Sequence, residues 1–261
     1  MSRMPEEAIT AFAGLVASFL SGLLGIGGGL VLTPLLLYLP PLLGGAAIPV
    51  KVITGLTIVQ AISGSLLGVL RHRRYGNVSM DLVWTMGPPA AVASLVGALV
   101  SQATPDRALL LIFAILAFAG AVMLLLPVDP QHAGADKIQY DRRLAIGLAI
   151  VLGFFGGMVG IGGIAFIIAV LVYVLRVPAR IAIGTSLGIG IFAAVAALIG
   201  KAATAQIDPL LAATVFVSAL VASPVGAAVS VRTQPRVLLA TLSVIVALAA
   251  VRIAVTAFTG T

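Results

Sequence analysis

A glycine-rich break inside an apolar run decides the fold of this chain. Residues 21–37 read SGLLGIGGGLVLTPLLL, with aliphatic side chains on both sides of the glycines. Each glycine inside a helix costs about 1 kcal/mol relative to alanine, so we expect helical structure to be interrupted at 25–29. The piece from Leu30 to Leu39 would be about 15 Å long as a helix, too short to cross the ~30 Å core of a bilayer. The stretch therefore predicts a broken, re-entrant or hairpin-like element.

The composition of the whole chain is that of a membrane protein. Of its 261 residues, 61% are hydrophobic and 9% are charged, whereas about 25% of a soluble domain is charged. About 20 apolar residues cross a bilayer, which leaves room for about eight to ten crossings with short connections. The apolar segments lack the strict alternation of barrel strands, so helices must satisfy the backbone in lipid. We predict an all-α polytopic membrane protein without a large extramembrane domain.

Residues that the chain lacks, or keeps outside its apolar segments, exclude several functions. It has no cysteine, which excludes a disulfide framework, a cysteine-based metal site and a thiol-dependent mechanism. Its acids and histidines lie at segment ends or in connections, so an interior proton relay is missing. Residues 184–188 (GTSLG) match the hydrolase pattern G-x-S-x-G but follow no strand. We expect that the protein is not an enzyme and that it has no catalytic residue, no cofactor and no metal ion.

The two halves of the chain resemble each other. Residues 25–28 (GIGG) recur as residues 160–163, and each copy has a glycine three residues before it. At a shift of 129 residues further pairs coincide: Lys51 and Arg180, Gly55 and Gly184, Thr57 and Ser186, Ser94 and Ser223, Gly97 and Gly226, Arg107 and Arg236. We predict an N-terminal transmembrane repeat over 1–126, a cytoplasmic linker over 127–143 and a C-terminal transmembrane repeat over 144–261.

The basic residues predict how the repeats are oriented. With eight plain spans they divide into eight inside and six outside, which is hardly a bias. If each glycine-broken element instead returns to the side it came from, three full spans remain in each half and the halves are inverted. Ten basic residues then lie inside (Arg71, Arg73, Arg74, Lys137, Arg142, Arg143, Arg176, Arg180, Arg232, Arg236) and four outside (Arg3, Lys51, Arg107, Lys201). The second arrangement obeys the positive-inside rule and is common in secondary transporters.

The breaks are candidate anion sites. A break leaves unpaired N–H groups and the positive end of the dipole at the start of the next half-helix, which suits a small anion near the midplane. Close helix packing through small residues is the alternative explanation of the glycines. The predicted substrate-binding residues are Gly25, Gly27, Gly28, Gly29, Thr33, Thr57, Gln60, Gly160, Gly162, Gly163 and Ser186. The Ser and Thr hydroxyls could equally bond their own helix backbone.

The same motifs carry a family resemblance. Gly25 to Gly29 closely followed by Thr33-Pro34, a glycine-rich partner after a mid-chain loop, and a mostly apolar chain of 261 residues together resemble the sulfite exporter TauE/SafE family. The resemblance implies a multi-pass protein of the bacterial inner membrane with two related halves. It implies transport, as an exporter, of small sulfur-containing anions such as sulfite, sulfonates or sulfoacetate. Ile164 stands where the pattern would have a third glycine, so we expect the first break to make the closer ligand contact.

Charged residues near the segment ends allow two interpretations. Lys51 and Arg180 could draw anions to the two mouths by their local field, or could snorkel to the interface. Arg252 lies within the last segment and is either snorkelling or buried. Asp81 and Asp208 are predicted helix N-caps. Besides a transporter that alternates its access between inverted halves, the sequence leaves open an anion channel and, less favoured, a membrane-embedded hydrolase. It predicts the lipid bilayer and a small anion as partners, no nucleic acid, and leaves a homodimer open.

Overall fold

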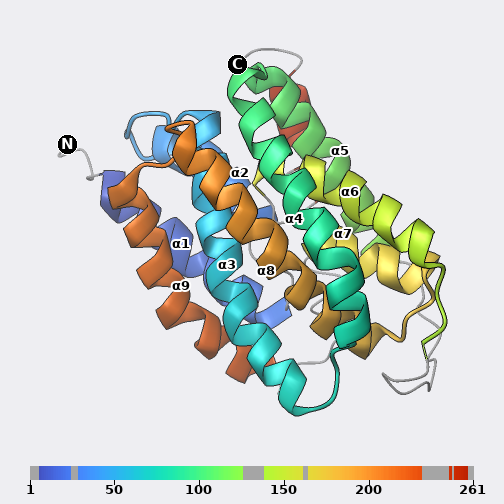
Figure 1. Ribbon diagram of the computed structural model, residues 1–261. Coiled ribbons are helices and arrows are strands. Elements are labelled where there is room, and N and C mark those ends of the chain that lie inside the picture. Colours follow the sequence, from blue (N-terminus) through green and yellow to red (C-terminus); the bar gives the residue numbers. More distant parts are fainter. Residues whose placement is uncertain are drawn as a thin grey trace.

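A computed structural model describes residues 6–24, 29–125, 138–160, 164–230, 247–248 and 250–257, and these form a bundle of helices (Figure 1). Its elements are α1 (Glu6–Leu24), α2 (Gly29–Leu42), α3 (Val50–Arg74), α4 (Met80–Ala103), α5 (Asp106–Leu125), α6 (Arg142–Val159), α7 (Ile164–Ala169), the π-helical turn η2 (Val170–Val174), α8 (Ala179–Ala203) and α9 (Pro209–Ser230). Among the described residues, five helices are long and apolar enough to cross a membrane, namely α1, α4, α6, α8 and α9. The prediction of an all-α polytopic membrane protein is confirmed.

Each glycine break separates a long helix from a short one. α1 has 19 residues and α6 has 18, whereas α2 after the first break has 14. After the second break, α7 has six residues and η2 five. At about 1.5 Å per residue, α2 spans about 21 Å and cannot cross a bilayer. By length alone α1 and α6 could cross, so the short part of each broken element is the part that follows the glycines.

The first broken element turns back on itself. A Cβ built on Gly45, which follows α2, would lie 3.0 Å from Cδ1 of Ile9 near the start of α1. The chain has therefore returned to the end of the bundle from which α1 set out. This is the path that we expect of a hairpin-like element.

In two pairs of helices, the backbones of the two partners are in close contact. Each pair contains one helix from the first half of the chain and one from the second. A Cβ on Gly22 of α1 would lie 2.0 Å from the Ser223 carbonyl oxygen of α9, and one on Gly157 of α6 would lie 2.1 Å from that of Ser94 in α4. Gly226 similarly meets the carbonyl oxygen of Phe19. Both pairs run parallel, and Figure 1 shows them on either side of α3 and α8. These glycines serve close helix packing.

α3 and α8 pack antiparallel in the middle of the bundle. A Cβ on Gly55, early in α3, would lie 2.4 Å from the carbonyl oxygen of Gln206 just after α8. At the other end, a Cβ on Gly184, early in α8, would lie 2.0 Å from that of Asn77 just after α3. The two contacts are related by the same shift of 129 residues that pairs the halves in the sequence. Each helix therefore ends where its counterpart begins.

The capping predictions have different outcomes. Asp208 caps α9, because its Oδ1 accepts hydrogen bonds from the backbone N–H groups of Leu210 (2.9 Å) and Leu211 (3.0 Å). The prediction for Asp81 is wrong. Ser79 occupies the N-cap of α4, and Asp81 lies inside the first turn. Its carboxylate accepts a hydrogen bond from the Tyr140 hydroxyl and so ties the segment before α6 to α4.

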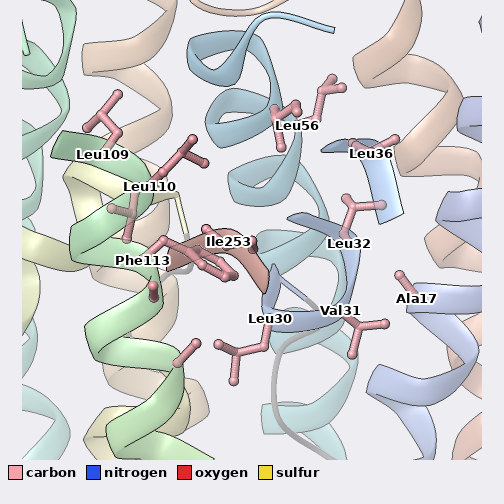
Figure 2. Packing of buried hydrophobic residues seen from close by; sticks show 14 of the residues in the cluster. Ala17, Leu30, Val31, Leu32, Leu36, Leu56, Leu109, Leu110, Phe113 and Ile253 are labelled. Carbon is pink, nitrogen blue, oxygen red and sulfur yellow. The ribbon is translucent and has the colours of Figure 1, made fainter. Parts of the chain in front are cut away.

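The short helix α2 is enclosed by protein. Gly29, Leu30, Leu32 and Leu36 are buried. Figure 2 shows the leucines of α2 in one apolar cluster with Ala17 of α1, Leu56 of α3 and Phe113 of α5. A helix that starts at a break has backbone groups without helical partners, and such groups are tolerated at membrane depth only inside protein. The apolar cluster therefore keeps the start of α2 inside protein and away from lipid.

Candidate functional site

The central pair α3 and α8 carries most of the predicted polar residues. Within α3 the side chains of Thr54, Thr57, Gln60, Ser63 and Ser65 are all buried, although five polar residues in one membrane helix are costly to bury. In α8 the adjacent residues 185 and 186 are buried as well. Polar groups thus lie along the contact between the two halves.

The second glycine break lies directly against this polar helix. Gly160 ends α6 in the left-handed region, with φ = 79°. A Cβ there would lie 2.0 Å from the carbonyl oxygen of Thr54 and 2.4 Å from Oγ1 of Thr57. Glycine is required for both the dihedral angle and the approach. Two predicted site residues, Gly160 and Thr57, are therefore brought together from opposite halves, beside the first turns of α3 instead of its centre.

The hydroxyls of the predicted site residues bond their own helices. Thr33 donates to the carbonyl oxygen of Gly29 (2.9 Å), Thr57 to that of Thr54 (2.9 Å) and Ser186 to that of Ile183 (2.8 Å). Each hydroxyl then presents lone pairs to its surroundings, and it must rotate before it can donate to an anion.

Gln60 is held from another helix. Its Nε2 donates to Oγ of Ser18 in α1 at 3.1 Å, within the interior of the bundle. The side chain therefore links α3 to the first broken element, at α1, the long helix that precedes residues 25–28.

The predicted residues do not form a single cluster. Ser186 lies near the start of α8, while Thr57 and Gly160 lie near its end. Lys201 marks that end, fifteen residues after Ser186, which corresponds to about 22 Å along the helix. The structure thus separates two polar regions, and Gly160 of the second break lies at the one that holds Thr57. Gly25, Gly27, Gly28, Gly162 and Gly163 lie outside the described residues.

Lys51 and Arg180 are the charged residues predicted at the two mouths of the transport path, and the structure describes the side chain of Lys51 only. Lys51 is half-buried at the start of α3, and its Nζ donates to the carbonyl oxygen of Gln102. Arg180 lies in the first turn of α8, and its side chain is outside the described residues. Arg252 is exposed, and its guanidinium lies 5.0 Å from the ring centroid of Tyr38, a cation–π contact.

The residue that the sequence analysis missed is Lys201. The positive-inside rule assigns it to the outside as a topology charge, yet its side chain is fully buried, with 0% exposed. Its Nζ donates to Oγ1 of Thr54 (2.8 Å), Oγ of Ser101 (2.6 Å), the carbonyl oxygen of Met158 (3.1 Å) and Oε1 of Gln206 (2.8 Å). These groups come from α3, α4, α6 and the segment after α8.

One sequence signal could have identified this residue. Lys201 is the only charged residue between Arg180 and Asp208, in the most apolar of the five candidate spans. A charge inside an apolar segment is a functional-site hypothesis by default. Its position close to the end of the segment made an interfacial location equally consistent with the sequence.

Comparisons with known proteins identify proteins that are similar to this chain. A family model described as "Sulfite exporter TauE/SafE" matches residues 10–253. A "Probable membrane transporter protein YunE" of Bacillus subtilis strain 168 is 24% identical over 260 residues, covering 92% of this chain and 94% of that protein. A "Probable membrane transporter protein" of Xylella fastidiosa strain 9a5c is 31% identical over 200 residues, covering 73% and 72%. No solved structure matches the chain.

The family match agrees with the architecture. It spans both broken elements and the central helices, and the relatives named as transporters cover most of the chain in their turn. The chain therefore belongs to the sulfite exporter TauE/SafE family, and it is a multi-pass membrane transporter and not an enzyme.

Proposed function

We propose that this protein is a secondary transporter that exports small sulfur-containing anions, such as sulfite or organosulfonates including sulfoacetate, across the bacterial inner membrane. It would alternate its access between two inverted halves. The family description names sulfite, and the excess of basic over acidic residues favours an anionic solute.

The observation that carries the proposal is the contact between the second break and α3. Gly160 from one half meets Thr54 and Thr57 from the other, so a solute bound there would touch both halves. A relative movement of the halves would then change the side from which that solute is reached. The opposite directions of α3 and α8 support inverted halves, because counterpart helices in an inverted repeat run in opposite senses.

Flux into proteoliposomes tests the proposal. Radiolabelled sulfite, sulfoacetate, taurine and sulfate are each offered with and without a pH gradient. We expect saturable uptake of sulfite or a sulfonate and exchange of internal for external label. Conductance without saturation and without exchange would instead indicate an anion channel, and the absence of flux for every anion of the panel would refute the substrate class.

A single hydroxyl tests the site. Thr57→Val keeps the shape of the side chain and removes the side-chain hydroxyl that faces Gly160. We therefore expect the apparent affinity for the transported anion to fall by about five- to tenfold, equivalent to one hydrogen bond. Thr214→Val is the matched control, because Thr214 also bonds its own helix, at the Leu210 carbonyl oxygen, but lies on α9 and is partly exposed. Equal kinetics for the two variants would contradict the role of Thr57.

The cellular membrane and the oligomeric state remain proposals of their own. We propose the bacterial inner membrane as the location, which fractionation of inner from outer membranes tests. A homodimer stays a prediction, and light scattering of the detergent-purified protein distinguishes one copy from two.

A further inference from the structure

Lys201 carries a charge without a counter-charge among its bonded partners. All four oxygens that it contacts are formally neutral: two hydroxyls, one amide oxygen and one backbone carbonyl oxygen. Buried ammonium groups are ordinarily paired with carboxylates, because neutral dipoles replace lost hydration incompletely. The side chain is nevertheless fully buried in the bundle.

The hydrogen bonds around Lys201 favour its charged form. The Thr54 hydroxyl donates to the Lys51 carbonyl oxygen (2.7 Å), and the Ser101 hydroxyl donates to that of Ala98 (2.6 Å), so both present lone pairs to Lys201. The carbonyl oxygen of Met158 can only accept.

The side-chain amide of Gln206 also presents an acceptor to Lys201. Its Nε2 donates to Oγ1 of Thr204 at 2.7 Å, which leaves Oε1 facing Lys201. Four acceptors and no donor therefore surround Nζ, and an ammonium group with three N–H donors matches such surroundings, whereas a neutral amine would need a donor.

The second cation of this region increases the need for negative charge. Lys51 donates to the carbonyl oxygen of Gln102, the residue after Ser101, and its own carbonyl oxygen accepts from Thr54. Both cations thus bond the end of α4, Lys51 at Gln102 and Lys201 at Ser101. Lys51 is half-buried and Lys201 fully buried, so positive charge continues from the outer end of α3 into the protein.

We propose that Lys201, with Thr54, Ser101 and Gln206 around it, is an anion-binding site of this transporter, and that its ligand is a small oxyanion of the sulfite or sulfonate class. The inference rests on the proposed function for the identity of the ligand. Three N–H donors share four acceptors, so at least one of the neutral contacts can be exchanged for an anion oxygen while the others hold the side chain. The adjacent Gly160 break, against Thr54, brings the second half to the same place.

Direct binding tests the inference separately from transport. Binding of radiolabelled sulfite and of radiolabelled sulfoacetate is measured on detergent-purified protein that elutes as a single species in size-exclusion chromatography. Lys201→Met removes the charge at similar length, and Lys201→Gln removes it while keeping an N–H donor for the neutral acceptors, in case the Met variant fails to fold. Lys201→Arg keeps the charge. Arg74→Met is the matched control, because Arg74 is exposed at the opposite end of α3.

We expect both neutral variants to bind at least about tenfold more weakly than wild type, since a charge-assisted hydrogen bond is lost. Lys201→Arg should retain measurable binding, and Arg74→Met should bind as wild type does. Wild-type affinity in Lys201→Gln would overturn the inference, and so would equal loss in the Arg and Gln variants, which would indicate a packing role.

The failure of the proposed function has a different signature. Lys201-dependent binding without flux of any tested anion would refute the transported class and leave the site standing. Flux of a tested anion together with unchanged binding in the neutral Lys201 variants would refute the site and leave the transported class standing. The absence of sulfite and sulfoacetate binding in the wild-type protein would overturn the site itself.

Discussion

Tyr140 shows how one side chain can tie a connection to the bundle. Its hydroxyl donates to Asp81 and lies 3.0 Å from Oγ1 of Thr85, both in α4. The contact joins the segment that ends the mid-chain linker to the first turns of α4. A capping role for Asp81 was the simplest interpretation of the sequence, since the partner is 59 positions away in the chain.

The protonation of Tyr140 gives a pH-dependent prediction. Burial raises the pKa of the Tyr140 phenol above its ordinary value, and the hydrogen bond to Asp81 raises it further. A group whose pKa is raised on folding contributes stability below its unfolded pKa, about 10, and loses that contribution as the pH rises through the folded pKa. The near-ultraviolet absorbance of phenolate, with Tyr140→Phe as the reference, should show a tyrosine that titrates late. In Asp81→Asn the same tyrosine should titrate earlier, and an unchanged titration there would contradict the role of the carboxylate.

Asp208 gives a prediction about stability. Asp208→Ala removes the side-chain acceptor for two N–H groups of α9, and we expect the free energy of unfolding in detergent to fall by about 1 kcal/mol. Asp208→Ser keeps an acceptor and should lose only a fraction of this. Equal denaturant midpoints for the Ala variant and the wild type would show that the cap contributes nothing.

At the scale of the elements, glycines set how closely the helices approach. The contacts of Gly157 and Gly22 are with carbonyl oxygens of the backbone, which cannot move aside as a flexible side chain can. An added methyl group would push α6 from α4, or α1 from α9. Helix α6 also carries Gly147, where an added Cβ would meet nothing within 4 Å, so the effect depends on the position and not on the residue type.

Two substitutions in α6 separate these cases. Gly157→Ala puts a Cβ 2.1 Å from the Ser94 carbonyl oxygen, and we expect a loss of about 1–3 kcal/mol of stability from overpacking. Gly147→Ala meets nothing within 4 Å in the same helix, and should stabilise by about 0.5–1 kcal/mol. Denaturant unfolding of the two purified variants measures both. A Gly157→Ala protein as stable as the Gly147→Ala protein would refute the close approach of α4 and α6.

At the scale of the whole molecule, the direction of the helices distinguishes two topologies. Arg107 follows the end of α4, where Ser101 bonds Lys201 near the end of α8. Arg176 precedes the start of α8, which is 25 residues long, or about 37 Å. The two arginines therefore lie toward opposite ends of the bundle, as the arrangement with inverted halves requires.

The absence of cysteine from the chain makes this topology directly measurable. Arg107→Cys and Arg176→Cys each introduce one thiol at an exposed position. We expect a membrane-impermeant maleimide added to intact cells to label the first and not the second, while both react after permeabilisation. Arg74→Cys serves as the internal reference for the cytoplasmic side. Labelling of both single-cysteine proteins from outside would favour eight plain spans and refute the inverted arrangement.

Several features could be predicted from residue pattern alone. A hydrophobic composition with few charges requires a membrane-spanning helical fold, because lipid provides no partners for backbone groups. The glycine run at 25–29 and its copy at 160–163 indicate where a helix is interrupted and that two halves are related. The motifs also indicated the family. All of these depend on local chemistry or on the comparison of one stretch with another, which the order of residues contains.

Only the tertiary structure decided which polar groups meet. The residues next to Lys201 in the sequence do not show whether it lies at the membrane interface or inside the protein. Its burial depends on Thr54, Ser101 and Met158, which are 43 to 147 positions away. Asp81 became a partner of Tyr140 instead of a cap for the same reason. The sequence by itself determined that helices would break and that they would cross a membrane. The folded arrangement of four segments determined that the Lys201 amino group lies inside the protein, without a carboxylate among the oxygens that it contacts.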